Sequence, residues 1–171
     1  KAFIHDLKDV YSDKLVWFVF GFFGIAQFSM MVVSQVQMFT YVEYMQFSAP
    51  EKTFVHVGGM VGFAVGSFFL GGLVKRLDKK KTGFLAMIIG SLGCLALLAI
   101  FTGGLMEPKS VPLFMTGDEA FHLSSVVFGV LQTLWWGGCG IIVPLATSMI
   151  ADLSLVKRLQ TGEVTEGRYA A

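Results

Sequence analysis

Four long stretches of the chain contain no Lys, Arg, Asp or Glu. They are residues 15–42, 53–74, 82–106 and 120–151. A helix needs about 20 apolar residues to cross the ~30 Å hydrocarbon core of a bilayer, so each stretch is long enough for one crossing. The pattern therefore predicts an all-α, polytopic membrane protein with four transmembrane helices. We expect these helices at residues 15–44, 53–74, 83–106 and 120–151.

The polar segments between these stretches differ in charge. Most of the 13 Lys and Arg residues fall in residues 1–14, 75–82 and 152–171. The positive-inside rule places such segments in the cytoplasm. Residues 1–14 are therefore predicted as a cytoplasmic linker, 75–82 as a basic cytoplasmic loop and 152–171 as a cytoplasmic segment. Residues 107–119 are predicted as an extracytoplasmic loop, and both ends of the sequence as cytoplasmic.

The composition narrows the class of protein. Hydrophobic residues make up 54% of the chain and charged residues only 15%. Four long uncharged runs in one short chain exclude a soluble globular domain, a disordered chain and a disulfide scaffold. A net charge of +1 gives no reason to expect a nucleic-acid partner. Cys94 and Cys139 lie in apolar stretches and are expected to be free thiols. The sequence has no metal-ligand motif, nucleophile constellation or phosphate loop, so we expect no metal, no cofactor and no catalytic residues.

One face of the first predicted helix is polar. Side chains recur there at spacings of three and four residues, namely Gln27, Met30, Ser34, Gln37, Tyr41 and Tyr44. At about 100° per residue they share one face, and a polar face in a membrane contacts protein or water rather than lipid. Two interpretations stay open. The face lines a polar cavity for a small hydrophilic solute, or its amides form hydrogen bonds that hold the helices together.

The last apolar stretch is longer than one crossing requires. It contains a glycine-rich segment at residues 137–140 and then Pro144, both of which favour a break or bend. Gln132 and Trp136 stand close to the glycines. An aromatic side chain beside a glutamine suits a sugar platform, whereas the alternative is that the ring fills space left by the glycines. In the second apolar stretch, Gly58, Gly62 and Gly66 predict close helix packing or a sliding surface.

Two segments resemble the major facilitator superfamily. Residues 71–81 resemble its glycine-then-basic loop, G-x-x-x-[basic]-R-x-G-[RK]-K, with Asp78 where Gly is common. Residues 151–167 look like the segment after helix ten of glycoside–pentoside–hexuronide:cation symporters, the melibiose-carrier-like branch. The matching residues are Ala151, Asp152, Thr161, Gly162, Glu166 and Gly167. Residues 155–158 depart from the D-Y-G-E of that family, which implies that part of its inner gate is altered or lost here.

The resemblance implies that this sequence corresponds to helices seven to ten, a partial C-terminal half of the superfamily fold. It also implies a bacterial inner-membrane carrier that moves a sugar or glycoside by alternating access. A coupling cation, Na⁺ or H⁺, would be bound mainly by the half that this sequence lacks. The partners would be the lipid bilayer, a small polar solute, and the remaining helices of a full-length chain or a larger membrane complex.

These expectations define two sets of candidate residues. The predicted substrate cavity is lined by Gln27, Ser34, Gln37, Tyr41, Gln132 and Trp136. The predicted cytoplasmic gate consists of Arg76, Asp78, Lys79, Asp152 and Glu166. The rival interpretation is a non-transporting accessory or assembly subunit built on a carrier-like scaffold, favoured by the absence of a charged side chain within the apolar stretches. An enzyme is not expected, because no set of catalytic groups is present.

Overall fold

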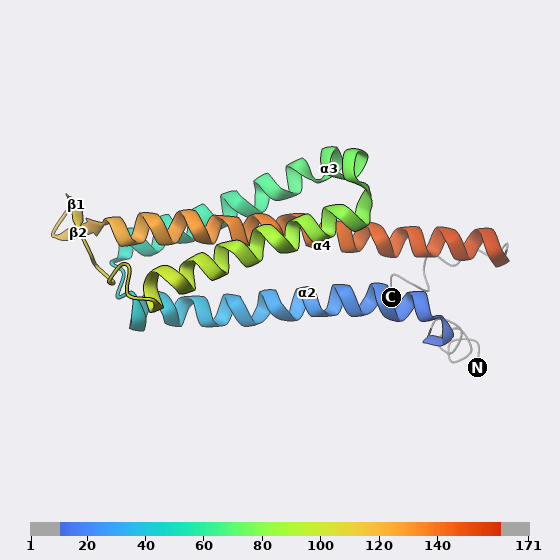
Figure 1. The fold of residues 1–171 in the computed structure, drawn as a ribbon, viewed down its shortest axis with the longest axis horizontal. Helices are drawn as coiled ribbons and strands as arrows, with labels where there is room; N and C mark the ends of the chain where they lie inside the picture. The colour runs from blue at the N-terminus through green and yellow to red at the C-terminus, as the bar shows by residue number, and fades with distance from the viewer. Residues whose placement is uncertain (1–10, 162–171) are drawn as a thin grey trace. The chain divides into compact units, whose positions relative to one another are not determined.

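The computed structural model describes residues 11–161. Helix α2 spans Lys14–Phe39 and continues as a π-helical turn, η1, over Thr40–Tyr44. Helix α3 spans Ala49–Leu97 and continues as a second π-helical turn, η2, over Leu98–Thr102. Strands β1 (Pro112–Thr116) and β2 (Glu119–His122) precede α4, which spans Leu123–Thr161 (Figure 1).

Three helices of the described chain are long and apolar enough to cross a membrane. They are Lys14–Tyr44, Ala49–Thr102 and Leu123–Val156. The sequence predicts four separate crossings, and the second and third of these both fall within α3. The backbone of α3 departs from helical geometry at Asp78, with φ 70° and ψ 159°. We call residues 49–77 the first arm of α3 and residues 79–97 the second arm.

The first arm runs in the same direction as α4. A Cβ atom added to Gly62 would overlap the carbonyl oxygen of Thr133, and one added to Gly66 would overlap that of Gly137. Higher-numbered residues of the arm thus meet higher-numbered residues of α4. Backbones approach this closely only where the side chain is a hydrogen atom, as in small-xxx-small packing between membrane helices. The glycines of the first arm therefore form a close packing surface.

The second arm runs in the opposite direction. A Cβ added to Gly138 would lie 2.7 Å from the carbonyl oxygen of Ala86, whereas one added to Gly93 would lie 2.8 Å from that of Leu131. Higher-numbered residues of this arm meet lower-numbered residues of α4. The two arms are therefore antiparallel. Helix α3 reverses direction at Asp78, and this turn is visible in Figure 1. Residues 75–82, predicted as a loop, are assigned to helix on both sides of this one residue.

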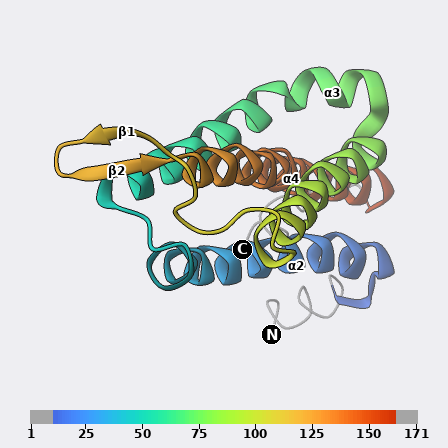
Figure 2. The same cartoon turned by 60° about the vertical axis from the view of Figure 1, so that its left-hand side comes forward.

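A β-hairpin occupies the segment predicted as the loop 107–119 and the start of the fourth helix. Strands β1 and β2 pair antiparallel and lead directly into α4 (Figure 2). Gly117, with φ 63°, supplies the left-handed conformation at the turn. Phe114 stacks on Phe121 with ring centroids 4.9 Å apart. The described chain is thus mostly helical rather than all-α, and α4 begins at Leu123 rather than at residue 120.

The chain divides into two compact units. One unit includes the described residues 11–29 and 143–161, where Val16, Val19 and Leu153 form a buried apolar cluster. Asp13 begins α2 there, because its carboxylate accepts a 2.9 Å hydrogen bond from the amide of Leu15. The other unit is residues 30–142 and contains the site described below.

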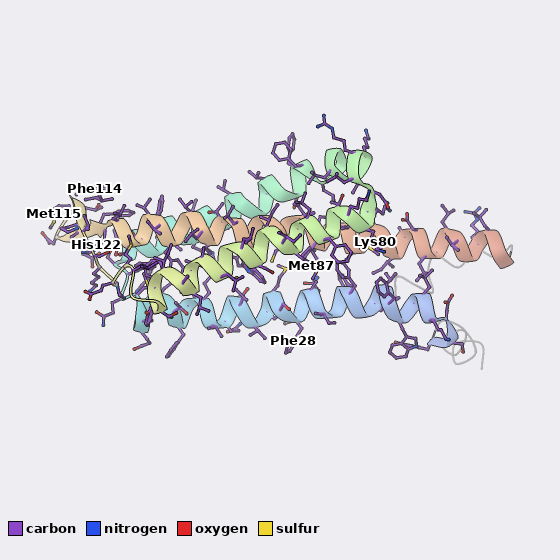
Figure 3. All side chains as sticks on the ribbon, viewed as in Figure 1. Phe28, Lys80, Met87, Phe114, Met115 and His122 are labelled. Carbon is purple, nitrogen blue, oxygen red and sulfur yellow. The ribbon has the colours of Figure 1, made fainter. Side chains whose placement is uncertain are left out.

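Large apolar side chains cover the outside of the helices. Phe28 is 69% exposed, Phe68 83% and Met87 50%, and Phe28 and Met87 are labelled on α2 and α3 in Figure 3. Exposed large apolar side chains along all of the long helices are unusual for a soluble monomer and indicate contact with a membrane or another protein. Together with the length of the helices, it indicates that lipid surrounds them.

Candidate functional site

A buried hydrogen bond joins η1, which continues α2, to α4. The hydroxyl of Tyr41 donates to Oε1 of Gln132 over 2.6 Å. Tyr41 is 0% exposed and Gln132 is 4% exposed. Polar side chains are expensive to place among apolar helices unless they find partners, so a bond of this kind is either a packing device or part of a polar site.

Gln37 lies one turn before Tyr41 on the same helix and belongs to the same cluster. Its side chain is a second polar neighbour of the Tyr41 hydroxyl, and it is 8% exposed. Two buried atoms of the cluster have no hydrogen-bond partner among the described residues: Oε1 of Gln37 and Nε2 of Gln132. We refer to Gln37, Tyr41 and Gln132 as the amide–tyrosine cluster.

Aromatic rings surround the phenol of this cluster. Phe128 of α4 meets the Tyr41 ring edge-on at 5.6 Å, and Phe47 lies 5.8 Å from it. Phe101 of η2 packs on Phe128 at 5.7 Å. These rings bury the hydroxyl in apolar surroundings, where a hydrogen bond is stronger than in water.

The π-helical turn η1 sets the position of Tyr41. Residues just after the turn bond back to it: the amide of Met45 donates to the Thr40 carbonyl over 2.9 Å, and the amide of Phe47 donates to the Tyr41 carbonyl over the same distance. The Tyr44 hydroxyl reaches the other π-helical turn and donates to the Phe101 carbonyl over 3.0 Å. Short π-helical turns are frequent at functional sites. Nothing in the spacing of residues 40–44 indicates such a turn.

The other three predicted cavity residues lie in different surroundings. Ser34 is exposed and donates to the Met30 carbonyl over 2.8 Å, so its hydroxyl is used within its own helix. Trp136 packs on the first arm of α3, with its ring 6.5 Å from that of Phe63 and its Cδ1 2.6 Å from where a Gly59 Cβ would be. Gln27 is half-buried in α2, in the other compact unit.

Three of the predicted gate residues lie at the reversal of α3. Arg76 and Asp78 are exposed and Lys79 is half-buried. The Asp78 carboxylate accepts a 2.5 Å bond from the Lys79 amide, and the Asp78 carbonyl accepts a 2.7 Å bond from the hydroxyl of Thr82. Both bonds start the second arm. Asp152 is exposed on α4 in the other unit, and Glu166 lies outside the described residues.

One buried carboxylate is not among the residues predicted from the sequence. Glu51 is 0% exposed, and its Oε1 accepts a 2.7 Å bond from the amide of His122 and lies 3.0 Å from His122 Nδ1. Its Oε2 accepts bonds from the amide and the hydroxyl of Ser48, at 2.9 Å and 3.1 Å. The sequence contains a local indication of this role, because Ser48 and Glu51 form the S-x-x-E pattern of a capping box. The distant partner His122 left no signal.

Within residues 11–161, no three His, Cys, Asp or Glu side chains gather where they could hold a metal ion. The polar side chains of the amide–tyrosine cluster are two neutral amides and a phenol. Such groups bind neutral hydroxyl compounds through directional hydrogen bonds.

Long apolar helices with exposed hydrophobic surfaces and buried polar links define the chain as an integral membrane protein of the helical, polytopic class. The family described as MFS/sugar transport protein matches residues 1–171, and the chain belongs to this family. Membership in the major facilitator superfamily, expected from the basic loop at residues 71–81, is thereby confirmed. It indicates a sugar transporter rather than an enzyme. Neither a curated protein nor a solved structure matches the chain.

Proposed function

We propose that this chain forms part of a secondary active transporter that moves a sugar or glycoside by cation-coupled alternating access. The coupling ion is Na⁺ or H⁺, and the proposed branch is the melibiose-carrier-like symporters. The observation that carries the proposal is the amide–tyrosine cluster, a buried polar site between two helices of a sugar-transport family member.

The proposed topology has four crossings with both ends in the cytoplasm. The reversal of α3 at Asp78 supports it, because two antiparallel arms of one helix cross a bilayer twice. The positive charges at residues 75–82 favour the cytoplasmic side for this reversal. The amide–tyrosine cluster and the buried Glu51 then lie toward the extracytoplasmic side. A bacterial inner membrane is the proposed location.

The proposed solute path uses the cavity residues of the amide–tyrosine cluster together with Trp136. Arg76, Asp78 and Lys79, with Asp152 and Glu166, are proposed to make the cytoplasmic contacts that hold one state of the transport cycle. Loss of a charge there, as in Asp152→Asn, is expected to shift the balance between inward-open and outward-open states. Accessibility labelling from each side of the membrane measures that balance.

The test is uptake of labelled sugars by the full-length protein in proteoliposomes under an imposed Na⁺ or H⁺ gradient. We expect gradient-driven uptake of at least one glycoside, and weaker affinity for it in Gln37→Ala and Trp136→Ala. Gln35→Ala is the matched control, because Gln35 is an exposed glutamine on the same helix.

Two results would contradict parts of this proposal. Uptake with unchanged affinity in both variants would remove the cavity assignment while leaving the transport function. No uptake of any sugar under either gradient, together with co-purification of a stable larger complex, would favour the accessory subunit.

A further inference from the structure

The two unpartnered amide atoms beside Tyr41 have opposite hydrogen-bonding character. Oε1 of Gln37 can only accept a hydrogen bond, and Nε2 of Gln132 can only donate. Both residues are more than nine-tenths buried, and neither atom has a partner within the described chain. Buried polar atoms are nearly always hydrogen-bonded, so two such atoms in one cluster point to a group that completes them.

We propose that Oε1 of Gln37 and Nε2 of Gln132 form a subsite for one hydroxyl group of a neutral polyol. The proposal rests on the transport function proposed above. It specifies which atom of the site accepts a hydrogen bond from the ligand and which atom donates one. A hydroxyl donates one hydrogen bond and accepts others, so it satisfies both amides at once. A carboxylate has no donor for Gln37, and an ammonium has no acceptor for Gln132.

Tyr41 is the positioning residue of this subsite. Its hydroxyl donates to Oε1 of Gln132, and this bond fixes which end of the amide faces Tyr41. Nε2 is therefore left for the ligand. Without the phenol hydroxyl the Gln132 amide is free to rotate, and the subsite loses its fixed donor.

The surrounding rings suit the rest of such a ligand. Phe47 and Phe128 contact the Tyr41 ring and form apolar walls around it. Walls of this kind pack against the C–H face of a sugar ring and exclude water that would compete for the amides. Because Tyr41 is fully buried here, the hydroxyl reaches the subsite only when the α2 and α4 segments that carry the cluster separate. In this structure the subsite is therefore closed to a ligand.

The test pairs changes in the protein with changes in the ligand. Binding of methyl galactopyranoside, methyl glucopyranoside and methyl xylopyranoside, each with its monodeoxy analogues, is measured by calorimetry on the full-length protein. The variants are Gln37→Met and Gln132→Met, which keep side-chain length but remove the amide. Gln35→Met is the matched control.

We expect one deoxy analogue to bind the wild-type protein about tenfold more weakly than its parent, the size of one ordinary hydrogen bond. Each of Gln37→Met and Gln132→Met removes one of the two hydrogen bonds to this hydroxyl, so the ratio of the two affinities should fall in both variants and stay about tenfold in Gln35→Met. Tyr41→Phe should reduce the ratio while binding of the deoxy analogue itself changes little. If the methionine variants do not fold, Tyr41→Phe carries the test, because it removes only the hydroxyl that fixes the Gln132 amide.

Two results would overturn the proposal. If every deoxy analogue loses the same factor in wild type and variants, the amides do not contact the ligand hydroxyl and an internal water completes them instead. In that case transport of sugars stands and the subsite falls. If the wild-type protein binds none of these glycosides and takes up no sugar, the proposed function and this subsite fall together.

Discussion

The hydroxyl of Ser67 donates a 2.8 Å hydrogen bond to the carbonyl of Gly140. Pro144 stands four residues after Gly140 and has no amide hydrogen, so the helix itself supplies no donor to this carbonyl. An unpaired carbonyl is destabilising where no water can reach it, and serine side chains of neighbouring helices commonly complete such groups. Ser67 of the first arm of α3 therefore supplies the hydrogen-bond donor that Pro144 lacks.

This relationship predicts a coupled pair of variants. Ser67→Ala should destabilise the protein by about 1 kcal/mol, because the Gly140 carbonyl loses its partner. In a Pro144→Ala background the same change should have little effect, since the alanine amide restores the helical donor. Thermal unfolding in detergent micelles measures both. Equal losses in the two backgrounds would show that the bond does not depend on the proline.

The glycines of the first arm give a second prediction. Gly66→Ala places a methyl group against the Gly137 carbonyl oxygen, so the helices must move apart. We expect a loss of about 1–3 kcal/mol, the usual effect of overpacking. Gly71→Ala is the control in the same arm, because nothing lies within 4 Å of its added Cβ. There the helix preference of alanine should leave stability unchanged or higher. Similar unfolding temperatures for the two variants would contradict close packing.

At Asp78 we predict a substitution that stabilises the protein. Its backbone, at φ 70° and ψ 159°, lies in a region adopted almost only by glycine, and side-chain residues there are strained by about 1–3 kcal/mol. Asp78→Gly should therefore raise the unfolding temperature, with a net gain of about 1 kcal/mol after the added freedom of the unfolded chain.

Asp78→Asn separates the backbone effect from the charge. It keeps a side-chain oxygen for the Lys79 amide and leaves the strain unrelieved, so its stability should stay near wild type. A transport defect shared by both variants would then report loss of the gate charge. A lower unfolding temperature for Asp78→Gly would argue against strain at the reversal.

Glu51 supports a fourth prediction. Glu51→Ala leaves the amides of Ser48 and His122 without their buried acceptor, and breaking a buried polar pair of this kind destabilises by about 3 kcal/mol. Glu51→Gln keeps one acceptor oxygen and should fall between alanine and wild type. Glu43→Ala, at an exposed acidic residue in η1, should change stability little.

Hydrogen exchange provides a local readout for the same variants. The amide of His122 should exchange faster in Glu51→Ala than in Glu43→Ala, because its acceptor is gone. Identical exchange in the two variants would mean that the carboxylate does not protect that amide.

Sequence alone predicts the apolar helices because membrane crossings need long uncharged runs, and these runs are explicit in the chain. It also indicates that Gln37 and Tyr41 share a helix face, since they are four residues apart. It does not show that Gln132 meets that face, because the contact joins positions 91 residues apart. The structure brings these three side chains together, and their contact with a solute stays a prediction.

Other features escape sequence reasoning for specific physical reasons. The polar face of the first predicted helix includes Ser34, but a serine in a helix can bond to its own backbone, as this one does with the Met30 carbonyl. The β-hairpin cannot be predicted from Pro108, Pro112 and Gly117, because these residues are equally typical of irregular loops. The sequence predicts a reversal within residues 75–82 but not its confinement to Asp78, because aspartate rarely takes this glycine geometry.

Both arms of α3 pack against one glycine-rich segment of α4, residues 137–140, which the ribosome synthesises last of the three. During synthesis the two arms therefore enter the membrane before their shared partner exists. We expect them to remain exposed to the insertion machinery until α4 emerges. Packing of the glycine segment against both arms is then the step at which this part of the chain folds. Cross-linking of arrested nascent chains that end before or after residue 140 would show when the arms first contact this segment.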